Sequence, residues 1–259
     1  MNLGIAGKVA MVAAASKGIG LATAKLLAEE GCRVSICGRT EETLEAAEAE
    51  IQGESRSYVV DVADAEDLAW WLEQTQQDLG TPEILITNTG GPPAGLLSDL
   101  SEEQWQSGFE STLMNVVRLV NLVSPGMVEA KWGRIVHVTS LVAKEASDIL
   151  AVSSTLRGGL MNLTRLQARQ LAPSGVTVNA VLPGHTLTDR QRHLADVRAK
   201  RENITPEEAL EKQAAEVPMG RLADPREIAA PIVMLCGVDS GYISGVNLLV
   251  DGALIRSAG

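Results

Sequence analysis

The sequence predicts an α/β fold in which a parallel, doubly wound sheet is covered by helices on both faces. Short apolar runs alternate with longer stretches of helical spacing along the whole chain, which is the pattern of repeated strand–helix units. Hydrophobic residues make up 45% of the 259 residues but aromatic residues only 3%, so the core is aliphatic, as in sheets buried on both faces. No linker or repeat divides the chain, and we therefore expect one domain over residues 1–259.

The expected strands are short apolar runs, and most of them are followed by a helix whose ends carry recognisable signals. We assign strands to residues 8–13, 33–37, 58–62, 84–87, 135–139, 176–181 and 246–250. Helices are expected at 18–30, 40–51, 65–79, from 101 onward and at 153–171. Asp64 is a suitable N-cap, residues 101–104 fit a capping box, and Pro206 and Pro225 each stand at the first position of a later helix.

Residues 188–219 break this rhythm, because they form a long, polar, helical stretch between the sixth and the last strand. Ligands of such folds bind beyond the carboxyl ends of the strands, where this segment begins. We therefore expect a lid over the substrate. A helical insertion without a role in binding is the alternative.

The charge of the chain excludes several classes of partner. The formal net charge is −11 and no run of Lys and Arg reaches five residues, so nucleic acid and anionic membrane are not expected partners. One group of cations could attract an acidic acyl carrier protein, although a solvated helix face is the favoured interpretation. The group comprises Arg190, Arg192, Arg198, Lys200 and Arg201.

The three cysteines, Cys32, Cys37 and Cys236, have neither metal nor redox spacing. No metal site and no disulfide framework are expected, and a reducing compartment suits the chain. The N-terminus lacks the features of a signal peptide, and no apolar stretch reaches the ~18 residues that a membrane span needs. We therefore expect a cytoplasmic protein.

A glycine-containing turn between the first strand and the first helix is the first feature that carries chemistry. Residues 13–20 read Ala-Ala-Ala-Ser-Lys-Gly-Ile-Gly, and glycines here let backbone N–H groups approach a pyrophosphate at the helix N-terminus. The turn resembles the TGxxxGxG fingerprint of the short-chain dehydrogenases/reductases, with Ala13 and Ala14 in the places of the Thr and the first Gly. The resemblance implies a Rossmann-like, dinucleotide-binding domain. It makes Ala14, Ser16, Lys17, Gly18, Ile19 and Gly20 candidate cofactor-binding residues.

The family pattern continues along nearly the whole chain. Arg39 ends the second strand, where an acidic residue would bind the 2′-hydroxyl of NAD; together with Lys17 it suits the 2′-phosphate of NADP, so we expect NADP rather than NAD. The resemblance also implies cofactor contacts at Asp61, Val62, Asn88, Gly90, Pro183, Gly184, Thr186 and Thr188. Residues 242–252 are similar to the C-terminal strand of the family, which implies a homotetramer or a homodimer.

The resemblance places proton transfer on Asn115, Ser140, Ser153 and Arg157. Asn115 and Ser140 match the family's Asn and Ser, but its YxxxK motif falls on Ser153 and Arg157, and residues 140–180 contain no Tyr and a single Lys, Lys144. A Ser hydroxyl is a much weaker acid than Tyr, and Arg stays charged, so it can hydrogen-bond the nicotinamide ribose but cannot shuttle a proton. Losing a positioned general acid costs about 10²–10⁴ in rate, or roughly 3–5 kcal/mol.

Two histidines are candidates for the missing acid. His185 follows Pro183-Gly184, and its ordinary pKa suits proton transfer, although a loop histidine without a role is the favoured interpretation. His137 lies three residues before Ser140 on a strand, so alternation puts it on the opposite face and indicates a structural role.

These observations predict an oxidoreductase, similar to the 3-oxoacyl-acyl-carrier-protein reductases, that transfers hydride between nicotinamide and a carbonyl or alcohol. The expected substrate is a small molecule or an acyl thioester. The first alternative is a catalytically inactive nucleotide-binding or partner protein, which Ala14 and Ser153 also suit. A lyase or isomerase step on the same scaffold is the second alternative.

Overall fold

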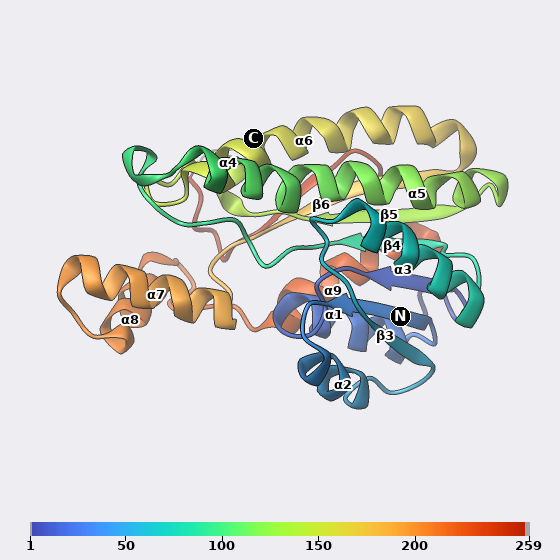
Figure 1. Ribbon diagram of the computed structural model, residues 1–259, viewed down its shortest axis with the longest axis horizontal. Helices are drawn as coiled ribbons and strands as arrows, with labels where there is room; N and C mark the ends of the chain where they lie inside the picture. Colours follow the sequence, from blue (N-terminus) through green and yellow to red (C-terminus); the bar gives the residue numbers. More distant parts are fainter. Residues whose placement is uncertain (1, 257–259) are drawn as a thin grey trace.

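Seven parallel strands form one sheet in the computed structural model, which describes residues 2–256 (Figure 1). Their order across the sheet is β3-β2-β1-β4-β5-β6-β7. The strands are β1 (Val9–Val12), β2 (Arg33–Gly38), β3 (Ser55–Val59), β4 (Ile84–Thr87), β5 (Gly133–Val138), β6 (Val176–Pro183) and β7 (Asn247–Val250). The order reverses at the β1–β4 pair, so the crevice in which such sheets bind ligands lies beyond the carboxyl ends of these strands.

Helices cover both faces of the sheet, which confirms the predicted single-domain, doubly wound α/β fold (Figure 1). One face carries α1 (Gly18–Glu29), α2 (Glu41–Ala49) and α9 (Pro225–Cys236). The other carries α3 (Ala65–Asp78), α4 (Glu102–Phe109), α5 (Asn115–Glu129) and α6 (Ala151–Leu171). Each face buries its own, mostly aliphatic cluster of side chains. Within residues 2–256, no helix combines the length and the apolar character needed to cross a membrane.

The predicted helical segment 188–219 forms a pair of helices that stands apart from the two layers (Figure 1). The pair consists of α7 (Asp189–Glu202) and α8 (Pro206–Glu216). A small alanine cluster joins them, and Gln191 Nε2 donates a buried hydrogen bond of 2.7 Å to Gln213 Oε1. The pair follows directly from the carboxyl end of β6 and thus begins beside the ligand-binding edge of the sheet.

The third strand begins at Ser55, three residues before the predicted start, and ends at Val59 rather than at residue 62. β3 is an edge strand that pairs only with β2, so its backbone can run through the polar residues 55–57. The apolar side chains of Val60 and Val62 lie beyond the strand and are buried in the cluster that contains Leu68 and Trp71 of α3. The apolar run at residues 58–62 therefore indicated buried side chains and not the extent of the strand.

The long helix predicted from residue 101 is interrupted. Its start is confirmed, because Ser101 and Gln104 form a capping box, but α4 ends at Phe109. A π-helical turn over Glu110–Met114 follows, and α5 begins at Asn115. π-helical turns are rare and frequently lie at functional sites, and a sequence pattern with a period of 3.6 does not reveal them.

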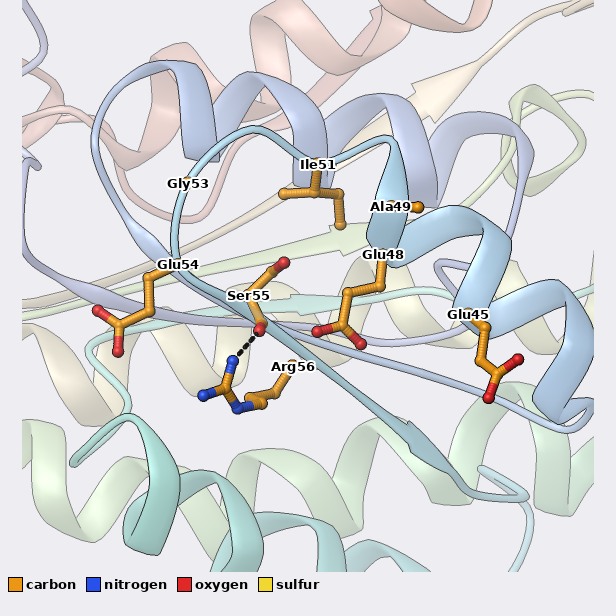
Figure 2. Close-up of a pocket in the computed structure, with 8 residues that line it drawn as sticks. All are labelled: Glu45, Glu48, Ala49, Ile51, Gly53, Glu54, Ser55 and Arg56. Atoms are coloured by element: carbon orange, nitrogen blue, oxygen red, sulfur yellow. Dashed lines mark hydrogen bonds between the residues drawn. The ribbon is translucent and has the colours of Figure 1, made fainter.

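An acidic hollow lies at the opposite, amino-terminal edge of the sheet, between the end of α2 and the start of β3 (Figure 2). Glu45, Glu48 and Glu54 line it together with Arg56, whose Nη1 donates to the Ser55 carbonyl at 2.8 Å. In the described part of the chain, no group of three or more His, Cys, Asp or Glu side chains is placed to hold a metal ion. The hollow also faces away from the strand ends at which a ligand is expected.

Candidate active site

The turn after β1 has the tight shape of a glycine turn although an alanine stands at its bend. Ala14 has φ +48° and Gly18 has φ +59°, both in the left-handed region. The Ala15 N–H donates to the Cys37 carbonyl at 2.9 Å, which fixes the turn against the end of β2. A Cβ on Gly20 would lie 2.6 Å from the Ala14 carbonyl oxygen, so only glycine fits there. Ala14 therefore holds a left-handed conformation that is strained for an L-residue.

The N-terminus of α1 points its free N–H groups out of this turn. Lys17 is the N-cap residue and makes no capping hydrogen bond with its side chain, so the first N–H groups of α1 remain available to an anion. Ser16 lies against the end of β2, because a Cβ on Gly38 would be 3.3 Å from Ser16 Oγ. Ile19, in the first turn of the helix, accepts a hydrogen bond from Thr23 Oγ1 at 2.7 Å.

The end of β6 reaches the same turn, as the predicted cofactor site requires. The Thr188 methyl carbon would lie 3.2 Å from a Cβ on Gly18. Lys17 Nζ lies 2.9 Å from the carboxylate of Asp189, the first residue of α7. Residues from opposite ends of the chain are thus brought together at the start of α1.

Pro183, Gly184 and Thr186 shape the path from β6 to Thr188. Pro183 is buried at the end of β6, and a Cβ on Gly184 would lie 2.6 Å from the Asp251 Cα. Thr186 is 4% exposed, and its Oγ1 donates to the Gly184 carbonyl at 3.1 Å. These contacts indicate that Gly184 and Thr186 hold the backbone in place rather than present polar atoms of their own.

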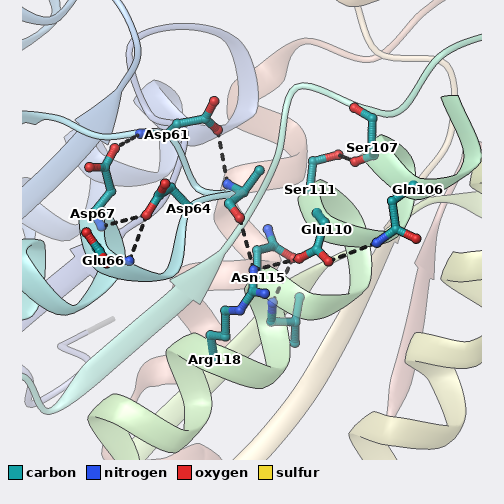
Figure 3. Close-up of polar contacts among 12 residues, drawn as sticks. Asp61, Asp64, Glu66, Asp67, Gln106, Ser107, Glu110, Ser111, Asn115 and Arg118 are labelled. Atoms are coloured by element: carbon teal, nitrogen blue, oxygen red, sulfur yellow. Dashed lines mark hydrogen bonds and ion pairs between the residues drawn. The ribbon is translucent and has the colours of Figure 1, made fainter. Parts of the chain in front are cut away.

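Arg39 and Asp61 follow the ends of the neighbouring strands β2 and β3, and both are exposed. Asp61 shapes its own loop, since its Oδ1 accepts from the Ala63 N–H at 3.0 Å and its N–H donates to Asp67 Oδ2 at 2.7 Å (Figure 3). Val62 is buried, so only its backbone can face a ligand. The Arg39 guanidinium forms no ion pair with any residue that the structure describes and is the free cation of this corner.

The end of β4 leaves open space beside the turn. Asn88 Nδ2 donates to the Ala14 carbonyl at 3.1 Å, which ties β4 to the turn. A Cβ on Gly90 would meet no atom within 4 Å. The predicted close approach of a ligand at Gly90 is therefore sterically possible.

Asn115 begins α5 directly after the π-helical turn and is only 1% exposed. Its Oδ1 accepts from the Val116 N–H at 2.7 Å, but its Nδ2 has no hydrogen-bond partner among residues 2–256. Arg118, one turn later, ties α5 to the loop after β3, because its Nη1 donates to the Ala63 carbonyl at 2.9 Å and lies 2.8 Å from the Glu110 carboxylate (Figure 3). A buried donor without a partner is available to a ligand or a water molecule.

Ser140, Ser153 and Arg157 meet around the end of β5. Ser140 follows this strand, and its Oγ accepts from the Val142 N–H at 3.4 Å. Ser153 and Arg157 lie one turn apart on the same face of α6, and each is only 6% exposed. Arg157 Nη1 donates to the Val138 carbonyl at 3.1 Å, two residues before Ser140. The structure thus brings Arg157 to the strand end that Ser140 follows, with Ser153 one helical turn before Arg157.

Arg190 is a residue of the site that sequence reasoning missed, because it was placed with the solvated cations of its helix. That interpretation holds for the exposed Arg192, Lys200 and Arg201 but not for Arg190. Arg190 turns inward, and its Nη2 donates to the Pro92 carbonyl at 2.8 Å in the loop after β4. Burial lowers its pKa. A helical pattern with cations on several faces did not single it out.

Among the described residues, the tyrosines and the two candidate histidines form no hydrogen bond with Ser140. The Tyr58 hydroxyl donates to Asp78 at 2.8 Å, and burial raises its pKa, while Tyr242 is fully exposed. His137 is structural, as predicted, since its two nitrogens are hydrogen-bonded within the core. His185 borders a hollow beside the end of β7, with its Nε2 3.8 Å from the Glu216 carboxylate.

Comparison with known proteins decides the family. The sequence profile of a family described as enoyl-(acyl carrier protein) reductase matches residues 13–254. The chain is 34% identical to the 3-oxoacyl-acyl-carrier-protein reductase FabG of Vibrio cholerae over 254 residues, which cover 98% of this chain and 99% of the relative. The chain belongs to the short-chain dehydrogenase/reductase family. It also shares 32% identity over 248 residues with the FabG reductase of Escherichia coli, covering 96% of this chain and 97% of the relative.

Solved structures of reductases in this family have the same fold. A crystal structure of an actinorhodin polyketide ketoreductase with NADPH matches with a TM-score of 0.93 and 30% identity, over 96% of this chain and 98% of that one. The L-sorbose reductase of Gluconobacter frateurii, in complex with NADPH and L-sorbose, matches with a TM-score of 0.94 and 28% identity over the whole of both chains. The predicted family and fold are therefore confirmed. The roles of the individual site residues stay predictions.

Proposed function

We propose that this family member is an NADP-dependent oxidoreductase that transfers hydride between nicotinamide and a carbonyl or alcohol group. The observation that carries the proposal is the convergence of the turn after β1, the open space at Gly90 and Thr188 at one edge of the sheet. The residues present fit a dinucleotide, because glycine is required at position 20 by the Ala14 carbonyl and α1 has an uncapped N-terminus. The two NADPH complexes among the similar structures support this choice.

The cations around the turn would select the phosphorylated cofactor. Lys17 already pairs with Asp189, so its charge is partly compensated. Arg39 is exposed and without an ion pair in the described residues, and its planar guanidinium suits a phosphate. We therefore assign most of the preference for NADP over NAD to Arg39.

The remaining residues would act on the substrate and on the nicotinamide side. The bound nicotinamide would supply or accept the hydride. Ser140 would orient the carbonyl oxygen by hydrogen bonding. Arg157 would hold a positive charge beside it, because burial lowers the pKa of Arg157 only to about 10 and the side chain stays protonated at neutral pH. Asn115 offers its unpartnered Nδ2.

Proton transfer is the weak step of this site. Ser153 and Arg157 would occupy the positions of the family's Tyr and Lys, and neither releases a proton at neutral pH. The proton would then come from water, and turnover would be about 10²–10⁴ lower than with a positioned acid. The names of the relatives favour a 3-oxoacyl type of carbonyl, on a small molecule or a thioester.

Two further parts of the proposal concern the lid and the assembly. The helix pair α7–α8 would close over the substrate, since it begins at the site residue Thr188 and carries Arg190 on its inner side. Two or four copies would assemble through the surface next to β7, where Tyr242 and Ile243 are exposed.

A catalytically inactive nucleotide-binding protein is the second candidate function. The observation that favours it is the chemistry of the buried pair on α6, where Ser153 and Arg157 provide no general acid. Stoichiometric NADPH oxidation in the presence of 3-oxo compounds would decide for the oxidoreductase. NADPH binding without any oxidation across a panel of carbonyl compounds would decide for the inactive protein.

Arg39→Ala tests the cofactor assignment. We expect the wild-type chain to bind NADPH more tightly than NADH in fluorescence titrations, because one charge-assisted pair at the 2′-phosphate is worth about 1.5–3 kcal/mol. The variant should therefore lose about tenfold or more in NADPH affinity and little in NADH affinity. Arg56→Ala, at an exposed arginine on the amino-terminal half of β3, is the matched control. Equal losses for both cofactors would remove Arg39 from the phosphate site.

A further inference from the structure

Two arginines of the candidate active site, Arg157 and Arg190, form no ion pair with any residue that the structure describes. Arg157 is 6% exposed and makes one hydrogen bond, from Nη1 to the Val138 carbonyl, while its Nε has no partner among residues 2–256. Arg190 makes one hydrogen bond, from Nη2 to the Pro92 carbonyl. An arginine has five N–H donors, so most donors of this pair are unused by the protein.

The pair is electrostatically unfavourable in the protein alone. Burial, together with the positive charge of Arg190, lowers the pKa of Arg157 to about 10, with no acidic side chain acting in the opposite direction. Arg190 likewise has its pKa lowered by burial and not raised by any acid. Arg198, on the same helix as Arg190, shows the contrast, because it lies 2.9 Å from the Glu216 carboxylate and 2.8 Å from that of Glu202. Charges withdrawn from water are normally paired, and residues 2–256 supply no carboxylate partner to either guanidinium.

Contacts between elements place both groups on the substrate side of the site. Arg190 binds the carbonyl of Pro92, and a Cβ on Gly108 of α4 would lie 3.3 Å from Pro92 and 2.4 Å from Val152. Val152 precedes Ser153, one turn before Arg157 on α6. Arg190 itself lies at the base of α7, two residues after Thr188. Arg190 also lies against the loop after β4, because a Cβ on Gly91 would be 3.1 Å from its Nε. The two groups therefore lie beyond the ends of β4 and β5, at the base of the helices proposed as the lid.

We propose that Arg157 and Arg190 bind a carboxylate of the substrate, so that the chain acts on an anionic oxo acid rather than on a neutral carbonyl compound. This inference rests on the proposed function for the identity of the reaction, but the anion site itself does not depend on it. A carboxylate supplies the missing counter-charge and can accept hydrogen bonds from both guanidinium groups.

The test compares acetoacetate with methyl acetoacetate, which carry the same 3-oxo group and differ in the charge. Dissociation constants are measured by isothermal titration, with and without saturating NADP⁺, which has no hydride to transfer to the oxo group, on the wild-type chain, Arg157→Gln, Arg190→Gln and Arg192→Gln. Arg192 is the matched control, because it is exposed on the same helix as Arg190. Inorganic phosphate is titrated as a third probe to separate a carboxylate site from a phosphate site.

We expect the wild-type chain to bind the acid about tenfold or more tightly than the ester, as a charge-assisted pair predicts. Arg190→Gln and Arg157→Gln should bring this ratio close to one, while Arg192→Gln keeps it and Arg190→Lys restores part of it.

Equal binding of acid and ester, no binding of the acid at tens of millimolar, or a preference that survives in Arg190→Gln overturns the proposal, even if Arg157→Gln fails to fold. Tighter binding of phosphate than of acetoacetate, lost in the same variants, also overturns it. Failure of NADP⁺ to bind would instead contradict the proposed function and leave the acid-to-ester ratio readable.

Discussion

At the scale of single residues, Ala14 shows that a turn can keep the geometry of glycine without the glycine. Its φ of +48° costs an L-residue about 1–2 kcal/mol. Glycine relieves this strain but adds about 0.4–1 kcal/mol of backbone entropy to the unfolded chain. We therefore expect Ala14→Gly to raise the free energy of unfolding by about 0.5–1 kcal/mol, measured by urea denaturation. Ala15→Gly, at a neighbouring residue without a positive φ, is the control and should lower stability.

The residue scale also sets the limit of what the sequence could predict at the site. The resemblance to the family assigned Gly18, Gly20 and Thr188 to one cofactor site, and in the structure Thr188 lies beside Gly18 because both segments follow strand ends of a parallel sheet. Arg190 could not be found this way, since whether a cation on the first turn of a helix faces inward depends on the loop after β4 that it contacts. The left-handed conformation of Ala14 could not be predicted from the sequence either, because alanine has no preference for a positive φ.

At the scale of elements, the packing of α4 on α6 positions Ser153 and Arg157. Substitutions at Gly108 and Gly159 test the importance of this packing. A Cβ on Gly108 of α4 would lie 2.4 Å from Val152 Cγ1, a stiff and fully buried side chain of α6. Gly108→Ala should therefore lower the free energy of unfolding by about 1–3 kcal/mol and weaken substrate binding, because α6 is displaced. Gly159→Ala is the matched control, because Gly159 lies on the exposed side of α6 and an added Cβ would meet no atom within 4 Å. This variant should raise the free energy of unfolding by about 0.5–1 kcal/mol. Thermal unfolding of both variants measures the difference, and a Gly108→Ala protein as stable as wild type would contradict this account of the contact.

Helices and strands were predicted well where the hydrophobic pattern or a capping signal is strong. They were predicted poorly where strand pairing or helix packing sets the boundaries. The buried strands β1, β4 and β6 were located from apolar runs, whereas β3 was shifted because an edge strand pairs on one side and tolerates polar residues 55–57. The capping box predicted at Ser101 and the prolines at positions 206 and 225 located three helix starts to the residue, and the structure adds capping boxes at Thr205 and Asp224. The π-helical turn before Asn115 has no comparable signature, since it depends on how α4 and α5 pack on the rest of the fold.

At the scale of the whole molecule, His137 couples three elements and makes the fold sensitive to acid. Its Nδ1 lies 2.8 Å from Thr87 Oγ1 on β4 and its Nε2 lies 2.9 Å from Gln167 Oε1 on α6, while the residue itself belongs to β5. Burial lowers the pKa of His137 from 6.5 to about 4. The folded chain therefore keeps this imidazole neutral in a pH range where the unfolded chain protonates it.

The sign of the effect on stability follows from proton binding. Between pH 6.5 and pH 4 the unfolded state binds more protons than the folded state, so the free energy of unfolding falls as the pH is lowered. His137 alone should remove about 2 kcal/mol between pH 7 and pH 5, above the range in which carboxylates titrate. His185 acts in the same direction, since burial lowers its pKa as well. The measurement is urea denaturation of the wild-type chain and His137→Gln across this pH range. The slope of the free energy of unfolding against pH is compared, and not its absolute value. The variant should show a shallower slope, exposed His193→Gln should keep the wild-type slope, and identical slopes in all three would mean that His137 is protonated in the folded state without penalty.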